Sequence, residues 1–268
     1  MKCQICQHEN EGGRFCENCG SKLITSTKDE TAATVESAHS SSDKVQYFET
    51  TKKISNQYFN YFIQVLKKPY ASSQSVGSEH FINGIMTIIL FSLLIPLIFY
   101  FALKGVLADF SSYGSNFFGT PVEIKPPFTD IVIKPFFAYI IFTFLVITFT
   151  FASIKLGRIN VSYKEVTARF GSLLIPFVSL LAISLIMSIL KIKFFFYFLL
   201  LGFIGSIFMI PPLVIASYKK DHQEGVDVIF GSLLTYVLTF ISISIMANML
   251  FEVLRSVFSS FYGGFFDL

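Results

Sequence analysis

FINGIMTIILFSLLIPLIFYFAL, residues 81–103, is a run of 23 residues without a charged side chain. A helix of this length covers the roughly 30 Å thickness of a bilayer's hydrocarbon core. Four further apolar runs follow at 135–156, 170–190, 194–217 and 228–251. The chain is 53% hydrophobic and 15% charged, with a mean hydropathy of +0.61. We therefore predict an all-α polytopic membrane protein whose five-helix transmembrane domain occupies residues 81–251.

The sequence before the first run divides into three parts by composition. Residues 1–24 contain all four cysteines, and residues 25–43 are rich in Ser, Thr, Ala and Glu, which is typical of a flexible linker. Residues 44–68 combine apolar residues at three- and four-residue spacing with polar ones, and Pro69 ends the pattern. Because no apolar run precedes Phe81, we expect no cleavable signal peptide.

The pattern of residues 44–68 predicts an amphipathic helix. Tyr47, Tyr58 and Val65 share one face, and Lys52 and Lys53 lie on the other. An aromatic stripe beside lysines suits the plane of a membrane interface. A helix packed against the protein's own spans would show the same pattern, so both interpretations stay open.

The cysteines form two C-x-x-C pairs separated by nine residues, and they predict a metal site. Each pair places two sulfurs on one tight turn, and two such turns supply the tetrahedral four-sulfur shell that zinc prefers. We predict structural Zn²⁺ bound by Cys3, Cys6, Cys16 and Cys19. His8 lies nearby, but four thiolates already complete the shell. The thiolates also leave this region negatively charged, which argues against nucleic-acid binding.

A sequence repeat links the later spans. VTARFGSLL at 166–174 recurs as VDVIFGSLL at 226–234, and the similarity continues without a gap into the following span. The second and third spans and the fourth and fifth spans are therefore predicted to be copies of one helical hairpin. Small and hydroxyl residues recur along both copies, which favours close helix packing over a substrate-lining face. In the fourth span, Gly202, Gly205 and Ser206 predict another surface of close helix approach, and Pro211-Pro212 predicts a kink.

Charged residues predict the topology and exclude several activities. Ten Lys and Arg residues flank the spans on the side of the N-terminus and six on the other side, which favours a cytoplasmic N-terminus and an extracytoplasmic tail at 252–268 in the plasma membrane. Thiolates that bind zinc also persist best in a reducing cytosol. Away from their ends the expected spans contain no Asp, Glu, Lys, Arg or His, which argues against a proton-coupled pump or an intramembrane protease. We expect no enzyme and no catalytic residue.

The stretch Phe15–Leu23, FCENCGSKL, closely resembles the short N-terminal zinc ribbons of many bacterial membrane proteins. That resemblance implies that Cys3, Cys6, Cys16 and Cys19 are the ligands; Gln7 departs from the glycine that often follows the first pair. The five spans with a cytoplasmic N-terminus resemble, in architecture alone, the Yip family of five-span proteins, whose eukaryotic members imply membrane trafficking.

These observations predict a membrane-anchored docking or regulatory protein. The zinc ribbon would bind a protein partner, and the bundle would contact the lipid bilayer and could form homo-oligomers. The alternative is a channel or carrier for a small uncharged or lipid-like molecule, with the segment around Pro211-Pro212 and the hydroxyl residues lining a path.

Overall fold

The structure is a computed structural model that describes residues 9, 55–118, 126–219 and 225–266. The chain divides into two compact units, Met1–Lys52 and Lys53–Leu268. The second unit is built from helices: residues 55–67, α2 (Pro69–Gln74), the 3₁₀ turn η1 (Ser78–His80), α3 (Phe81–Phe118), the π-helical turn η2 (Thr129–Ile133), α4 (Lys134–Leu156), α5 (Tyr163–Ile189), α6 (Phe195–Lys219) and α7 (Val228–Phe266). α3 to α7 are each long and apolar enough to cross a membrane, which confirms the predicted all-α class with five spans and fits a multi-pass membrane protein.

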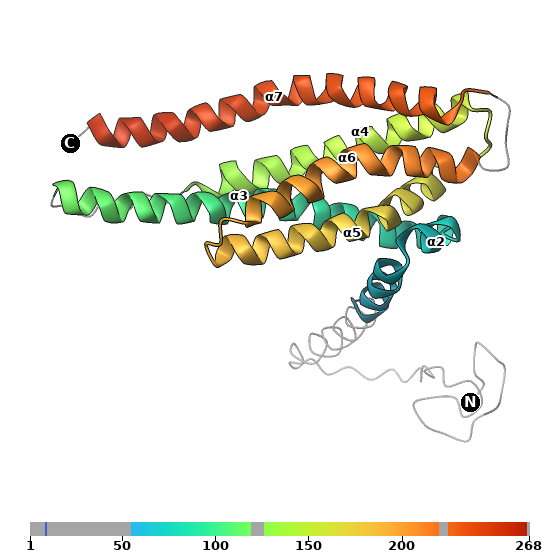
Figure 1. The fold of residues 1–268 in the computed structure, drawn as a ribbon, viewed down its shortest axis with the longest axis horizontal. Coiled ribbons are helices and arrows are strands. Elements are labelled where there is room, and N and C mark those ends of the chain that lie inside the picture. The colour runs from blue at the N-terminus through green and yellow to red at the C-terminus, as the bar shows by residue number, and fades with distance from the viewer. Residues whose placement is uncertain (1–8, 10–54, 119–125, 220–224, 267–268) are drawn as a thin grey trace, which may run out of the picture. The chain divides into compact units, whose positions relative to one another are not determined.

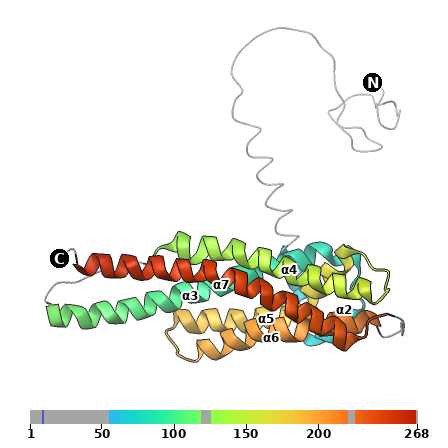
Figure 2. The same ribbon diagram turned by 90° about the horizontal axis from the view of Figure 1, so that it is seen from above.

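The five long helices run side by side (Figures 1 and 2), and their main contacts follow one another around a ring. α5 lies between α3 and α6, α7 lies between α6 and α4, and contact between α4 and α3 closes the ring. Ile88, Ile147, Leu174 and Ile210 are fully buried in the core. Large apolar side chains also face outward on all five helices, for example Val106, Ile141, Ile186, Leu201 and Phe240. Such an outer surface suits contact with lipid.

Two helices continue beyond the predicted spans because the end of an apolar run is not the end of a helix. The predicted spans leave residues 104–134 as a connection, yet α3 continues to Phe118. The predicted tail, residues 252–268, is helical as far as Phe266, because α7 continues into it. At 38 and 39 residues these helices are about 57 Å long, nearly twice the hydrocarbon thickness. Charges such as Lys104 end the lipid-compatible segment, but neither extension contains a proline that would end the helix.

Glycines set the closest helix contacts around α5. A Cβ atom on Gly171 would lie 2.5 Å from the Cα atom of Gly84, so α3 and α5 touch backbone to backbone there. On the other side of α5, a Cβ atom on Gly202 would lie 2.8 Å from Leu181, and one on Gly205 would lie 2.9 Å from Phe177. The predicted close-approach surface at Gly202 and Gly205 is therefore confirmed. Small residues serve this purpose because lipid supplies no hydrophobic drive between helices.

The hydroxyl residues of α7 lie at its contact with α4. The Thr235 and Ser153 hydroxyls are 2.9 Å apart, which joins the two helices. Thr235 and Thr239 also donate to carbonyls four residues earlier in α7, and both are buried. These contacts agree with the predicted packing role of the hydroxyl stripe.

α6 continues through Pro211-Pro212. The backbone carbonyl that loses its amide donor there accepts a hydrogen bond from another helix. Pro212 cannot donate to the carbonyl of Phe208, four residues earlier. The Tyr236 hydroxyl of α7 donates to that carbonyl instead. A neighbouring helix thus satisfies a carbonyl that would otherwise be exposed to lipid.

The two copies of the sequence repeat occupy different environments. Phe170 is 3% exposed at the centre of the ring, whereas Phe230 is 67% exposed on its outer surface. Gly171 touches the backbone of α3, whereas a Cβ atom on Gly231 would come no closer than 3.6 Å to any neighbour.

This difference predicts that replacing glycine with alanine has opposite effects on stability at the equivalent positions 171 and 231. Gly171→Ala should lower the free energy of unfolding by about 1–3 kcal/mol, because the added methyl group meets backbone. Gly231→Ala should be neutral or stabilising by up to about 1 kcal/mol, because alanine favours the helix. Thermal unfolding in the same detergent compares the two; equal losses would contradict the backbone contact at Gly84.

Tyr236→Phe should lower the free energy of unfolding by about 1 kcal/mol, because the Phe208 carbonyl loses its donor. Tyr197→Phe is the matched control, since Tyr197 is 66% exposed. The measurement is the denaturation midpoint in mixed micelles; an unchanged midpoint for Tyr236→Phe would show that the hydrogen bond adds no stability.

Candidate functional site

The site is built around Arg169, a buried arginine near the start of α5. The expected third span began at residue 170 and left Arg169 outside, but α5 begins at Tyr163. Ser162 caps the helix by accepting a hydrogen bond from the Glu165 amide at 3.2 Å. This Ser-x-x-Glu arrangement is a known helix-start signature. The earlier start places Arg169 in the second turn, where it is only 8% exposed.

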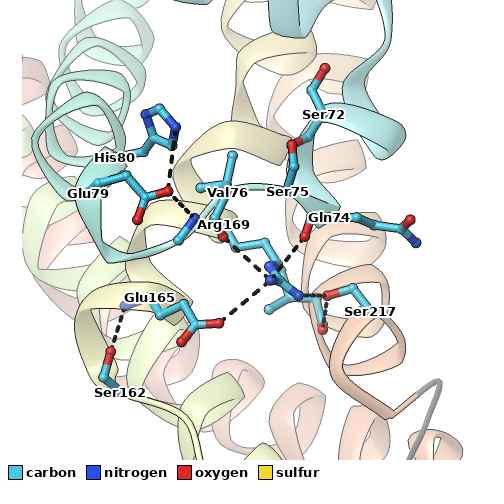
Figure 3. Close-up of polar contacts among 12 residues, drawn as sticks. Ser72, Gln74, Ser75, Val76, Glu79, His80, Ser162, Glu165, Arg169 and Ser217 are labelled. Atoms are coloured by element: carbon cyan, nitrogen blue, oxygen red, sulfur yellow. Dashed lines mark hydrogen bonds and ion pairs between the residues drawn. The ribbon is translucent and has the colours of Figure 1, made fainter.

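Arg169 joins three separate segments of the chain (Figure 3). One terminal nitrogen donates to the Ser217 hydroxyl of α6 at 3.1 Å. The other lies 3.4 Å from both the Gln74 and Val76 carbonyls, which belong to α2 and the turn after it. The second nitrogen also lies 3.6 Å from the Glu165 carboxylate, one helical turn earlier in α5.

The guanidinium plane has a further contact with an aromatic ring. Its central carbon lies 3.8 Å from the ring centroid of Tyr218 in α6, within the range of a cation–π interaction. Only arginine combines this flat face with several donors in a fixed fork. The arrangement satisfies a buried charge with carbonyls, a hydroxyl, a carboxylate and a ring; only the Nε–H has no hydrogen-bond partner.

The segment held by Arg169 connects the N-terminal region with the first span. Within its helical residues 55–67, Val65 is 1% exposed, and the Tyr58 hydroxyl lies 3.0 Å from that of Thr87 in α3. The Tyr61 ring stacks on His80 with the centroids 5.3 Å apart. Burial raises the pKa of both Tyr58 and Tyr61, so both phenols stay neutral at pH 7.

These contacts show that Tyr58 and Val65 of the amphipathic segment pack on the protein's own spans. A second apolar stripe, however, is exposed to the surroundings: Phe59, Ile63, Leu66 and Tyr70. The segment from 55 to 74 therefore has one apolar face on the bundle and another that is free in the structure.

The predicted metal ligands lie outside the described residues. This applies to Cys3, Cys6, Cys16 and Cys19, and also to the non-ligand His8. Within the described part of the chain, no group of three or more His, Cys, Asp or Glu side chains could hold a metal ion. The zinc site therefore stays a prediction from the sequence.

Sequence reasoning missed Arg169 as a site residue, although the repeat contained a signal. At the position equivalent to Arg169 the second copy has Ile229, which is 67% exposed on the outer surface. The first copy thus has a charged residue where the second copy has an apolar one, although the surrounding segments match. This difference indicates that Arg169 has a role that the second copy lacks. The capping signature at Ser162 would have placed the arginine inside the helix.

The chain is 32% identical over 238 residues to "Uncharacterized protein YvbI" of Bacillus subtilis (strain 168). The alignment covers 89% of this chain and 90% of the relative. The chain belongs to the family of that protein. No family model matches the sequence, and no solved structure matches it.

Arg169→Gln should release α2 and the turn after it. The substitution removes donors from the Gln74 and Val76 carbonyls and should lower stability by about 2–3 kcal/mol, as expected for hydrogen bonds to a charged group. Hydrogen exchange of the amides of residues 69–77 should become at least tenfold faster.

Lys164→Gln is the matched control for Arg169→Gln. Lys164 is exposed on the same helix, five residues earlier, and loses the same charge. Unchanged exchange over residues 69–77 in the Arg169 variant would show that this segment is held by its apolar contacts alone.

Proposed function

We propose that this member of the YvbI family is a docking protein of the plasma membrane. A cytoplasmic zinc ribbon, with Zn²⁺ bound by Cys3, Cys6, Cys16 and Cys19, binds a protein partner, and the five-helix bundle holds the ribbon at the membrane. Zinc bound by four cysteines has no open coordination position, so it stabilises a small fold and presents its surface for binding.

The observation that carries this proposal is the attachment of residues 55–80 to the bundle. Arg169, Tyr58 and Val65 fix the segment that leads from the cysteine region into the first span. A docking module needs such an attachment, because a partner captured by the ribbon is then held close to the bundle.

The interior of the bundle supports anchoring more than transport. The pocket between Phe91, Phe142, Phe170 and Ile207 has a volume of about 10 Å³, roughly enough for a single water. Its lining is mainly apolar, with Thr143 and Ser206 as the polar residues. No observation of the described residues favours a solute path.

Cys16→Ser combined with Cys19→Ser should abolish zinc binding and partner binding together. Elemental analysis of the purified wild-type protein should give about one zinc per chain, as expected for a tetrathiolate site, and the double variant should give almost none. Crosslinked partners recovered in mild detergent should be lost with the zinc, while the bundle stays inserted in the membrane.

His8→Ser serves as the control, because it changes the same region without removing a predicted ligand. It should keep both the zinc and the partner. A wild-type protein without zinc would refute the metal site. Zinc loss with unchanged partner recovery would keep the site and refute docking through the ribbon.

A further inference from the structure

The helical residues 55–67 and α2, with Lys68 between them, line an open pocket of about 390 Å³. It is lined by Asn60, Ile63, Gln64, Lys67, Lys68 and Ser72. All but Ser72 are exposed, whereas Tyr58 and Val65 on the opposite face of the same helix are buried. The pocket therefore lies on a face of the helix that the described residues leave exposed.

The positive charge of the residues that line this pocket favours an anionic ligand. Its lining contains two lysines and no acidic residue. Neither Lys67 nor Lys68 forms an ion pair or a side-chain hydrogen bond with another residue that the structure describes. The amides of Asn60 and Gln64 and the hydroxyl of Ser72 add neutral donors around the two charges. Unpaired ammonium groups surrounded by donors favour a phosphate-like group.

The apolar residues beside the pocket indicate which molecule carries that group. Phe59, Ile63, Leu66 and Tyr70 are exposed at three- and four-residue spacing along the same segment. One of them, Ile63, also lines the pocket, so apolar and basic surface are continuous there. An exposed apolar stripe next to lysines is the arrangement of helices that lie in a bilayer interface. A soluble anion would make no use of the stripe.

The position of the pocket in the fold agrees with a lipid as the ligand. α2 ends at Gln74, only a few residues before the first membrane-crossing segment begins at Ser78. Arg169 of α5 holds the Gln74 and Val76 carbonyls at the same end of the bundle. The pocket is thus fixed near the end of the apolar spans, which is the depth of lipid headgroups.

We propose that this pocket binds the headgroup of an anionic glycerophospholipid. Lys67 and Lys68 contact the phosphate, Asn60, Gln64 and Ser72 contact the polar headgroup, and an acyl chain lies along Ile63 and Leu66. The proposal does not depend on the zinc ribbon, and it gives the segment before the first span a ligand of its own.

The test uses the full chain reconstituted into nanodiscs with equal amounts of phosphatidylglycerol and phosphatidylcholine. Native mass spectrometry after release in mild detergent should show one phosphatidylglycerol retained in preference to phosphatidylcholine. Lys67→Gln combined with Lys68→Gln should lower this retention by about tenfold to thirtyfold, since each lysine near an anionic lipid surface contributes about a fivefold effect or less. Lys67→Arg with Lys68→Arg should restore it.

Lys104→Gln combined with Lys193→Gln is the matched control. Both lysines are exposed and lie near the other ends of the spans, so the charge change is the same but the pocket is intact. Equal retention of the two lipids, or equal losses in both double variants, would overturn the proposal. Saturable binding of inorganic phosphate to delipidated protein, lost in the Lys67/Lys68 variant, would instead assign the pocket to a soluble anion.

Discussion

The burial of one positive charge, that of Arg169, constrains this structure more than any other interaction. A guanidinium removed from water needs several partners, and α5 alone offers only Glu165. The remaining partners come from α6, 48 residues away along the chain, and from the end of α2 and the turn after it, 95 and 93 residues away. The turn must therefore sit against α5, and the helical residues 55–67 are thereby brought onto α3. The contacts of Tyr58 and Val65 depend on that placement.

Composition and spacing were enough to predict the helical class, the five spans and the packing role of Gly202 and Gly205. Each depends on a property of one helix, such as its apolar length or its small residues. Contacts between distant residues could not be predicted in this way. Gly84 has no obvious partner in the sequence, yet it meets Gly171 backbone to backbone. Arg169 counted as a flanking charge because its carbonyl partners, Gln74 and Val76, are ordinary residues of a turn.

The amphipathic pattern of the segment before the first span suits contact with the bundle on one face and contact with the membrane interface on another. Its sequence suited both the bilayer interface and the protein's own spans, because apolar residues occur on two faces of the helix. Tyr58 and Val65 are buried, and the Tyr58 hydroxyl meets Thr87 of α3, while Phe59 and Leu66 stay exposed. A headgroup site on the outer face and an attachment on the inner face are therefore compatible. The proposed zinc site in the N-terminal region precedes both the headgroup site and the attachment in the sequence.

The hydrogen bond that the Tyr236 hydroxyl donates to the Phe208 carbonyl has a consequence for biosynthesis. The hydroxyl belongs to α7, which is translated after α6, so the Phe208 carbonyl lacks this donor when α6 is synthesised. During that interval the carbonyl must find another donor, such as a water molecule or a lipid headgroup. α6 is thus expected to stay near the insertion machinery until α7 arrives, and the two helices would then enter the bilayer as a pair.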